Sequence, residues 1–332
     1  MSAHLLPEVD CLHIDPAATA RTIESAIREI VLSRLKRKGV VVGLSGGIDS
    51  SVVAALCVNA LGKDRVLGLF MPERECSEEA LSFGLMLAES LQIPATIENI
   101  TSILTASGCY DRRDQAIREL IPEFDSTHKC KLVMPGFVSG ARYSVPSLVV
   151  ESADGTSRKV RLNAHVYLQM VAATNFKQRV RKMLEYYHAD CLQYAVAGTP
   201  NRLEFDQGFF VKNGDGAADL KPIAHLYKSQ VYQLADYFDL PAEIRERPST
   251  TDTFSLPQSQ EEFYFSLPLR TFDLCLYGKN HGLPLEEVAA MADLTRSQVA
   301  DVFAAIDAKR AATAYLHSPP LLVESVTEIV HP

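Results

Sequence analysis

The chain lacks both the long apolar runs of membrane proteins and the leader of secreted ones. No stretch of about 18 consecutive apolar residues occurs, so we expect no membrane-spanning helix. Residues 1–15, MSAHLLPEVDCLHID, have neither the basic region nor the long apolar region of a secretory signal. These absences predict a cytoplasmic protein that does not act at a membrane.

Cysteine pairs at metal-binding or redox spacing are also missing. The seven cysteines are scattered, and no two of them form a CxxC arrangement. His128 with Cys130, and His188 with Cys191, come nearest to metal-ligand spacing. We therefore expect ordinary reduced thiols, as in cytosolic proteins.

Basic residues are fewer than acidic ones, with 33 Lys and Arg against 41 Asp and Glu. The formal net charge is −8, which argues against a general nucleic-acid binder. An anionic substrate held in a locally basic pocket stays compatible with this charge. The 332 residues, 47% hydrophobic and 22% charged, have an ordinary globular composition and suit one large α/β domain or two small ones.

Apolar strands and amphipathic helices alternate along much of the chain. The strand predicted at 40–44 shows no polar alternation, as expected of a parallel strand covered on both faces. Further strands are predicted at 65–71, 93–100 and 191–197, and helices at 17–38, 50–61, 77–91 and 162–187. This alternation predicts the α/β class, with a doubly wound parallel sheet. Ligands should then lie at the carboxyl ends of the strands, in the loops 44–49, 71–77 and 198–204.

Residues 122–163 interrupt that alternation. Residues 143–151 and 157–162 flank Ala153-Asp154-Gly155-Thr156, which predicts a β-hairpin with an Asp-Gly turn. We expect 122–163 to be an insertion into a single domain that spans 1–332. Residues 266–332 return to helical patterns and are expected to form a C-terminal extension. In it, Thr295 and Gln298 predict a capping box at a helix start.

The predicted strand at 40–44 runs into a small, hydroxyl-rich loop, Ser45-Gly46-Gly47-Ile48-Asp49-Ser50-Ser51. Glycines let the backbone approach an oxyanion closely, and a following helix directs free N–H groups at it. This predicts a phosphate-binding loop. No lysine follows as in GxxxxGK[ST], and the glycines do not match GxGxxG. The competing interpretations are a tight turn without a ligand and, for Asp49, a simple helix N-terminal charge.

The loop resembles the signature of the ATP pyrophosphatases, or PP-loop proteins. A second block is similar to NAD synthetases, a family within that superfamily. It comprises Gly198-Thr199 with Glu204, the run from Gly208 to Pro222 (GFFVKNGDGAADLKP), and Leu226, Lys228 and Gln230-Val231 at a helix start. Upstream, Asn175, Arg179 and Arg181 resemble the Asn-x-x-x-Arg-x-Arg helix of that family. The resemblance covers roughly residues 15–265 and implies an adenine nucleotide alpha hydrolase-like fold.

The resemblance implies an ATP-dependent ligase that forms a carbon–nitrogen bond. Deamido-NAD is adenylated by ATP with release of pyrophosphate, and ammonia then displaces AMP to give NAD. The implied catalytic residues are Asp49, Lys228 and Glu204, and Asp49 and Glu204 each hold Mg²⁺. The implied ATP site comprises Gly43, Ser45, Gly46, Gly47, Asp49, Ser50, Ser51, Met71, Arg179, Thr199, Lys228 and Ser249. The implied substrate site comprises Asn175, Lys177, Lys212, Asp215 and Glu261.

Several positions depart from the family pattern on the acceptor side. Gln260 stands where the family has Asp, Phe265 stands where it has Gly, and Thr174 replaces a usual Gly. A second hypothesis is therefore a related amide-forming ligase that adenylates a different carboxylate. A third is a nucleotide-binding regulatory protein without turnover, although both candidate metal acids and Lys228 are present. A tRNA-thiolating enzyme ranks low, because the chain has no CxxC and is acidic.

Two expectations concern partners. Only about 40 residues precede the loop, too few for a glutaminase domain, so we expect free ammonia as the nitrogen donor. The family forms homodimers with active sites at the subunit interface. The predicted helix 162–187 carries apolar residues on more than one side, which favours a homodimer here too.

Overall fold

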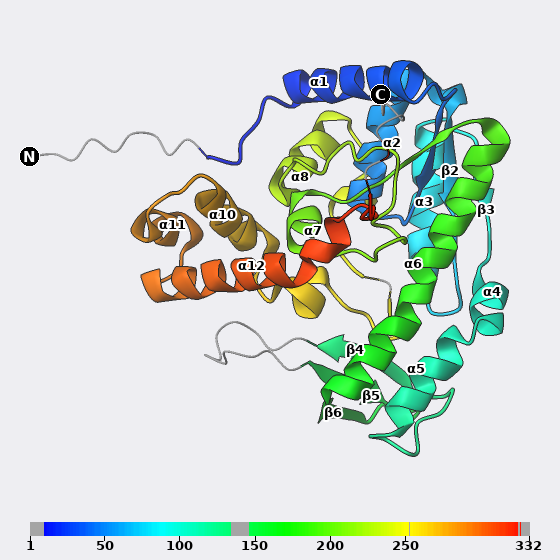
Figure 1. Cartoon of the computed structure of the whole chain (residues 1–332), viewed down its shortest axis with the longest axis vertical. Helices are drawn as coiled ribbons and strands as arrows, with labels where there is room; N and C mark the ends of the chain where they lie inside the picture. Colours follow the sequence, from blue (N-terminus) through cyan, green and yellow to red (C-terminus); the bar gives the residue numbers. More distant parts are fainter. Residues whose placement is uncertain (1–9, 134–145, 252, 325, 327–332) are drawn as a thin grey trace, which may run out of the picture.

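The computed structural model describes residues 10–133, 146–251, 253–324 and 326 (Figure 1). Its centre is a four-stranded parallel sheet in the order β3-β2-β1-β7. These strands are β1 (Val40–Gly43), β2 (Val66–Phe70), β3 (Ala95–Ile97) and β7 (Ala195–Ala197). Their carboxyl ends lie at one edge, and the predicted loops follow three of them.

Helices cover both faces of this sheet. Val40 and Val42 belong to one core cluster and Val41 to another, so successive residues of β1 point to opposite layers. The first layer contains α1 (Pro16–Arg28), α2 (Ile48–Leu61), α3 (Glu78–Ser90) and α8 (Lys228–Tyr237). The second contains α4 (Thr101–Ala106), α5 (Cys109–Arg118) and α6 (Ala164–Leu192). The predicted fold class, an α/β doubly wound parallel sheet, is confirmed.

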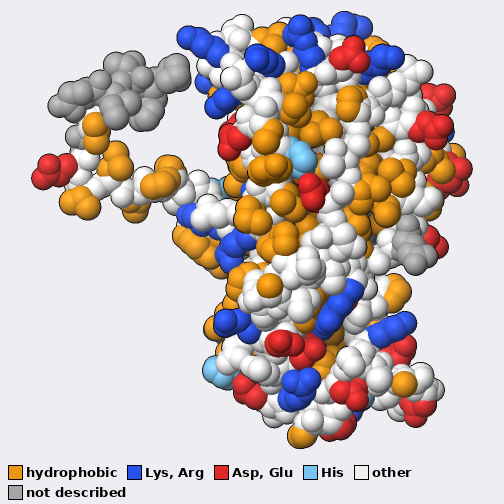
Figure 2. Space-filling view, turned by 90° about the vertical axis from the view of Figure 1, so that its right-hand side faces the viewer, with side chains coloured by type: hydrophobic (Ala, Val, Ile, Leu, Met, Phe, Trp, Pro, Cys, Tyr) orange, Lys and Arg blue, Asp and Glu red, His pale blue; other side chains and the backbone are white. Residues whose placement is uncertain are grey.

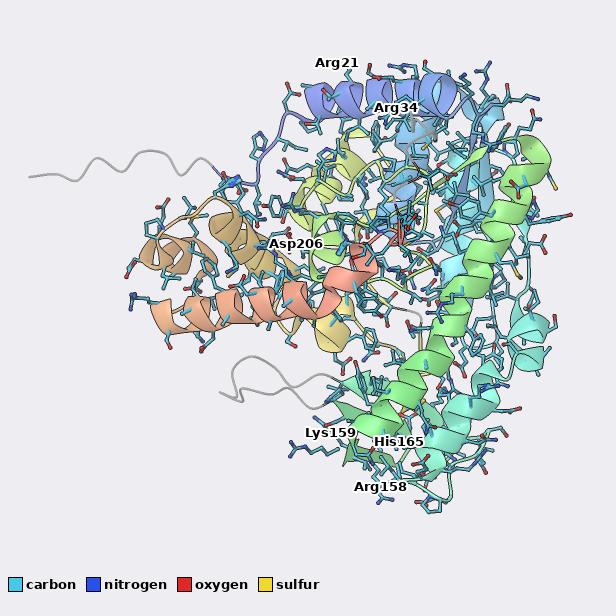
Figure 3. The ribbon with its side chains drawn as sticks, viewed as in Figure 1. Arg21, Arg34, Arg158, Lys159, His165 and Asp206 are labelled. Carbon is cyan, nitrogen blue, oxygen red and sulfur yellow. The ribbon has the colours of Figure 1, made fainter. Side chains whose placement is uncertain are left out.

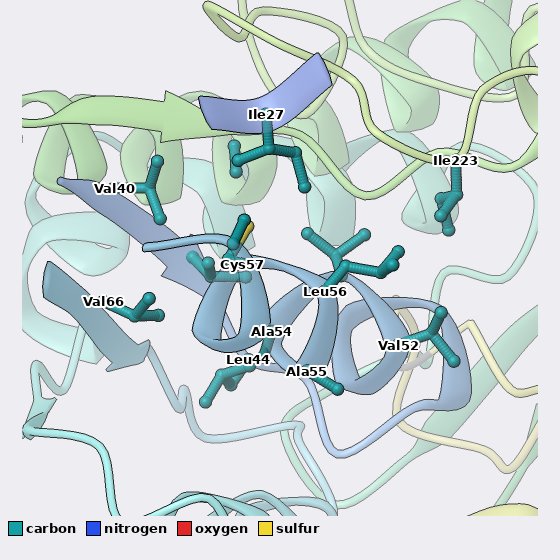
Figure 4. Packing of buried hydrophobic residues seen from close by; sticks show 14 of the residues in the cluster. Ile27, Val40, Leu44, Val52, Ala54, Ala55, Leu56, Cys57, Val66 and Ile223 are labelled. Carbon is teal, nitrogen blue, oxygen red and sulfur yellow. The ribbon is translucent and has the colours of Figure 1, made fainter. Parts of the chain in front are cut away.

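Helix α2 is the most deeply buried of these helices. It is apolar all round, and ten of its residues are buried. Figure 4 shows Leu56 and Cys57 of α2 close to Ile27 of α1 and to the strands that carry Val40 and Val66. Because the helix is held by packing on several sides, the loop before it is presented on a rigid support.

Some predicted boundaries are wrong. The strand predicted at 191–197 is only β7, because α6 continues to Leu192 and ends where Gln193 adopts a left-handed conformation. The strand predicted at 93–100 is reduced to β3, an edge strand with two exposed residues. The helix predicted at 17–38 is α1, followed by a π-helical turn at Glu29–Arg34. A short 3-10 turn, Lys63–Arg65, precedes β2.

A separate antiparallel sheet lies beside the amino-terminal half of α6. It has the order β4-β5-β6, with β4 (Lys129–Val133), β5 (Ser147–Glu151) and β6 (Ser157–Arg161). The predicted hairpin is confirmed: Glu151 pairs with Ser157, and Asp154 Oδ1 accepts from Thr156 N at 2.9 Å. Residues 143–145 of its first predicted strand lie outside the described residues. Strand β4 was not predicted, and its Cys130 and Leu132 pack into the core under this sheet.

The remaining chain is mostly helical. It contains α7 (Arg202–Gln207), α9 (Ala242–Arg245), a π-helical turn η4 (Glu261–Phe265), α10 (Leu269–Asn280), α11 (Leu285–Ala292) and α12 (Arg296–His317). The predicted capping box is confirmed, because Thr295 N donates to Gln298 Oε1 at 2.8 Å and Gln298 N donates to Thr295 Oγ1 at 3.2 Å. Within the described ranges, no helix is both long and apolar enough to span a bilayer.

Candidate active site

The loop between β1 and α2 has a backbone that requires glycine at one position. Gly46 has a φ of +73°, and a Cβ there would lie 2.2 Å from the carbonyl oxygen of Ala80. The hydroxyls of Ser50 and Ser51 both donate to the Gly47 carbonyl, at 3.0 and 2.8 Å. These bonds hold the first turn of α2, whose amide N–H groups point out of the helix end. The local geometry is that of an anion-binding helix start.

This loop opens into a cavity of about 800 Å³, the size of a site for a nucleotide or a drug-sized ligand. Its walls come from the ends of β1, β2 and β7, from α6, and from the segments 208–215, 247–251, 253–254 and 312–316. The predicted site residues that line it are Gly43, Ser45, Gly47, Asp49, Ser50, Met71, Asn175, Lys177, Arg179, Thr199, Glu204, Lys212, Asp215 and Ser249.

Four predicted site residues do not line the cavity. Gly46 is pressed against Ala80, and Ser51 is fully buried beneath the loop. Lys228 lies behind Asp49 and is 1% exposed. Glu261 accepts a hydrogen bond from Leu269 N at 2.9 Å and so helps to start α10. Gly46, Ser51 and Lys228 thus support the loop and Asp49 from behind, whereas Glu261 supports α10.

Asp49 and Glu204 come together around Asn201. The side-chain amide of Asn201 donates to Asp49 Oδ1 at 3.0 Å, and its backbone N–H donates to Glu204 Oε2 at 3.1 Å. The buried ammonium of Lys228 contacts the other oxygen of Asp49. The amide of Gln260 donates to Glu204 Oε1 at 3.0 Å. Two carboxylates from the first turns of α2 and α7, 155 positions apart in the chain, therefore meet at the cavity wall.

Negative charge is concentrated where Asp49 and Glu204 meet. Burial and the neighbouring Asp49 carboxylate raise the pKa of Glu204 to about 8, against the lowering effect of Lys228. The pKa of Asp215, which lines the same cavity, is raised by burial. Oxygen ligands that repel one another in this way suit a hard divalent cation such as Mg²⁺. In the part of the chain that the structure covers, no cluster of three or more His, Cys, Asp or Glu side chains could hold a metal without other ligands.

Three residues of the cavity wall also carry a buried polar atom without a partner. Ser249 Oγ, Thr251 Oγ1 and Gln260 Oε1 are buried and have no hydrogen-bond partner among the described residues. All three residues line the cavity. Buried hydroxyl and amide oxygens are normally hydrogen-bonded, so a small rotation of these side chains toward the cavity would offer polar groups to a ligand.

Helix α6 contributes the basic residues. Arg179 is exposed, and its Nε donates to the Lys212 carbonyl at 3.3 Å, which leaves the rest of its guanidinium for a ligand. Arg181 donates to the Met71 carbonyl at 3.5 Å, beside the loop after β2. Lys177 lines the cavity too, but its ammonium is bonded to protein oxygens on three sides. The positive charge offered to an anion from this helix therefore comes from the two arginines.

The end of α12 forms part of the cavity wall. Arg310 of α12 makes a bidentate ion pair with Asp206 of α7, at 2.7 and 2.6 Å, where Figure 3 shows Asp206 beside that helix. The Lys212 ammonium donates to the carbonyls of Tyr315 and Ser318, at 2.6 and 3.0 Å. In the structure Lys212 thus fixes the chain after the GFF run to the last turn of α12.

The three departures from the family pattern have structural explanations. Phe265 is fully buried among Phe209 and Phe272, so it serves the core of the helical part. Thr174 is buried, and its hydroxyl bonds back to the Met170 carbonyl at 3.0 Å. Gln260 has a donor where a carboxylate has none, and that donor reaches Glu204.

Comparison with known proteins shows the family of this chain. The model of the family described as NAD synthase matches residues 19–122 and 147–312. The chain belongs to the NAD synthase family. An NH(3)-dependent NAD(+) synthetase of Mesorhizobium japonicum is 56% identical over 96% of this chain and 99% of its own length. One of Rhizobium rhizogenes is 53% identical over 98% of both chains.

Solved structures share the fold. An NMN synthetase of Francisella tularensis has a TM-score of 0.63 at 21% identity, covering 93% of this chain and 99% of its own. An NH3-dependent NAD synthetase of Campylobacter jejuni has a TM-score of 0.60 at 24% identity, covering 94% and 100%. The α/β architecture is thus that of NAD synthases.

Some parts of the site were not visible in the sequence. Arg247 and Phe254 line the cavity, and Asp273 of α10 caps the start of α8 by accepting from Ser229 N and Oγ at 2.7 Å. None of the three lies in a recognisable motif. Asn201, in contrast, is followed three residues later by Glu204, which is a capping-box pattern, and the structure forms that box.

Proposed function

We propose that this chain converts deamido-NAD to NAD with ATP and ammonia, releasing AMP and pyrophosphate. The observation that carries the proposal is the joint position of the serine-rich loop, Asp49 and Glu204 at one large cavity. The two rhizobial relatives, named NH(3)-dependent NAD(+) synthetases and matched along nearly their whole length, support the same reaction.

The first step is adenylation of the substrate carboxylate. A carboxylate oxygen attacks the α-phosphorus of ATP, and the bond from that phosphorus to the β-phosphate oxygen breaks. Ser45, Gly47 and Ser50 are proposed to bind the departing pyrophosphate with hydroxyls and backbone amides at the start of α2. The guanidinium of Arg179 is proposed to offset the charge on the phosphates.

Asp49 and Glu204 fit a magnesium ion, since both offer carboxylate oxygens to one cavity and their mutual repulsion would be relieved by a cation. A bound Mg²⁺ would supply charge neutralisation for the triphosphate. The chain itself holds the two acids in place. Asn201 donates to both of them, and Lys228 orients Asp49 from behind.

The second step is amide formation. The nitrogen of ammonia attacks the carbonyl carbon of the adenylate, AMP leaves with the bonding electron pair, and the nitrogen loses one proton. Asp215 and Asn175 are proposed to contact the deamido-NAD side, where both line the cavity. Met71 and Ser249 are proposed to flank the adenine nucleotide. Met71 directly follows β2, and Ser249 lies in the segment after α9.

The test is to supply ATP, Mg²⁺, ammonium and deamido-NAD to the pure protein and to follow NAD and AMP by chromatography. We expect the two products in equal amounts. AMP or NAD missing from the mixture would contradict the proposed reaction. Glutamine in place of ammonium is expected to give no NAD, and glutamine-supported turnover by the chain alone would contradict free ammonia as the donor.

A second candidate is the same chemistry on a different carboxylate. It is favoured by the fold shared with an NMN synthetase, a protein named for a smaller product, and by the acceptor-side departures. Nicotinic acid mononucleotide is therefore the first alternative substrate to test in the same assay. A higher kcat/KM for it than for deamido-NAD would replace the first proposal with the second.

We further propose that the chain acts as a homodimer through the outer face of α6. Leu168, Met183 and Tyr187 of this helix are 62%, 54% and 59% exposed, although all three are large and apolar. Figure 2 shows hydrophobic side chains gathered over the middle of the face on that side of the molecule, with charged groups above and below. Leu168 also lines the cavity, whereas Met183 and Tyr187 lie one helical turn apart. Exposed apolar side chains gathered on one face mark interaction sites.

We also propose that residues 122–163 are an insertion into a single domain and that 266–332 are a helical extension of it. The family model passes over residues 123–146, which supports the first part. The helices α10, α11 and α12 contribute most residues of a core cluster separate from those of the parallel sheet, which supports the second.

A further inference from the structure

One lysine joins two walls of the cavity. The ammonium of Lys177 donates to Glu73 Oε1 at 2.9 Å and to Glu75 Oε2 at 2.7 Å, both in the loop after β2. It also donates to the carbonyl of Thr253 at 2.8 Å, in the segment that follows α9. The residue is 1% exposed. An ammonium has three hydrogens, so these bonds use all of its donors.

The two segments that Lys177 joins are far apart in the chain and both line the cavity. Met71, Pro72, Cys76 and Ser77 belong to the first, and the residues from Arg247 to Thr251, with Thr253 and Phe254, belong to the second. A side chain from α6, the longest helix of the second layer, thus fixes the spacing between them.

The acids that hold Lys177 are themselves anchored to the second layer of helices. Tyr110 of α5 donates its hydroxyl to Glu73 Oε2 at 2.7 Å. Arg113 of α5 donates to both oxygens of Glu75 at 2.7 Å and pairs with Asp114. Glu73, Arg113 and Lys177 are all at most 4% exposed. Buried charges of this kind are stable only when each has its partners, so the network favours one arrangement of the loop.

We propose that Lys177 is a positioning residue: its buried ammonium clamps the loop 71–77 to the segment that carries Thr253, and so sets the width of the nucleotide cavity. The residue does not bind the substrate through its ammonium, in contrast to the role that the family resemblance implies for it. The identity of the bound nucleotide rests on the proposed function, whereas the clamp rests on the contacts alone.

Hydrogen–deuterium exchange on the ligand-free protein tests the clamp. We compare the wild type with Lys177→Met and with the double variant Glu73→Gln/Lys177→Met, in which one buried negative charge is removed with the positive one. We expect exchange of the amides in 71–77 and 253–258 to become at least tenfold faster in both variants. Unchanged protection of both segments in the folded double variant would overturn the proposal.

The double variant also separates clamping from charge balance. If Lys177 serves only to neutralise buried carboxylates, the double variant regains both the unfolding temperature and the protection of the two segments, which overturns the proposal. If the lysine is a clamp, the unfolding temperature recovers while protection stays lost. Lys279→Met is the matched control, because Lys279 pairs with Asp307 and its ammonium lies over the Phe303 ring, outside the cavity. It is expected to leave both segments protected.

Binding of a non-hydrolysable ATP analogue, measured by calorimetry on the same variants, links the clamp to function. We expect the Kd to rise at least tenfold in the double variant, and the KM for ATP to rise with a smaller change in kcat. Loosened segments together with an unchanged Kd would support the clamp and overturn the proposed position of ATP. Protected segments together with a raised Kd would overturn the clamp but would agree with the proposed ATP site.

Discussion

The ammonium of Lys228 contacts the carboxylate of Asp49 across 179 positions of sequence. Each residue lies in the first turn of a helix, Asp49 in α2 and Lys228 in α8. Lys228 is buried, whereas Asp49 is partly open to the cavity. The pair therefore holds two helix starts together and aims one carboxylate into the site.

Removing either member of this pair should abolish activity, with unequal effects on stability. We expect Asp49→Asn and Lys228→Met each to lower kcat/KM at least about a hundredfold, as losses of electrostatic groups in active sites do. Asp49→Asn removes the carboxylate that contacts a buried ammonium, leaving the neighbouring Glu204 to balance it, and should cost about 3 kcal/mol in the free energy of unfolding. Lys228→Met should cost less, because Asp49 keeps Asn201 and its access to water. Denaturant unfolding and steady-state kinetics of both variants check this, and equal losses of stability would contradict it.

Magnesium binding should depend on pH through Glu204. Its pKa of about 8 means that the group is mostly protonated at pH 7, so a cation must displace a proton. The affinity for Mg²⁺ in the presence of a non-hydrolysable ATP analogue should rise nearly tenfold per pH unit up to about pH 8 and then level off. Calorimetry between pH 6 and 9 measures this, with Glu204→Gln expected to bind weakly and without that slope. A flat profile for the wild type would argue against Glu204 as a ligand.

Asp273 should make part of the stability pH-dependent. It is fully buried, and burial raises its pKa to about 6 even though Ser229 and the Lys228 N–H donate to it. A carboxyl with a higher pKa in the folded state binds its proton more tightly there. Its contribution to stability is therefore full below about pH 4 and is lost as the pH rises through 6.

The free energy of unfolding of Asp273→Asn, measured beside the wild type, isolates that contribution. The difference between the two proteins should change by up to about 3 kcal/mol between pH 4 and 7, the equivalent of about two pKa units. A difference that stays constant over this range would contradict the assignment.

Two adjacent glycines of the phosphate loop should respond differently to alanine. Gly46→Ala places a methyl group against the Ala80 carbonyl at a φ of +73°, and we expect a loss of at least about 2 kcal/mol together with weaker ATP binding. Gly47 has a φ of −94°, and a Cβ there would meet only the Ser45 hydroxyl at 3.2 Å. Gly47→Ala should therefore fold normally. Thermal unfolding distinguishes the two, and equal midpoints would contradict this account of the loop.

The proposed dimer should dissociate when charge is placed on α6. Met183→Glu puts a carboxylate beside the exposed Tyr187 on α6 and should yield a monomer by light scattering. Tyr237→Glu is the control, because Tyr237 is 48% exposed on α8, which lies in the other helical layer. A monomeric wild type, or a dimer that tolerates Met183→Glu, would contradict the interface.

Much of the fold and part of the site could be predicted from local sequence. Some features depend on only a few neighbouring residues, so the sequence alone indicates them. They are the valines of β1, the glycines and serines of the loop, and the capping boxes at Asn201 and Thr295. The ends of elements were less predictable. α6 extends to Leu192, into residues whose pattern also suits a strand, and β4 was not predicted because its alternation covers only five residues.

What only the tertiary structure decided is which charges neutralise one another. From sequence, Lys177 and Lys212 were basic residues near a binding motif, and each could equally well have met a substrate. In the folded chain the first is enclosed by Glu73, Glu75 and Thr253, and the second holds the end of α12. The propensity of a segment for helix, strand or turn depends on neighbours along the chain, so it can be predicted from the sequence. An ion pair depends on distance in space, and the packing of α5, α6 and the loop after β2 sets that distance.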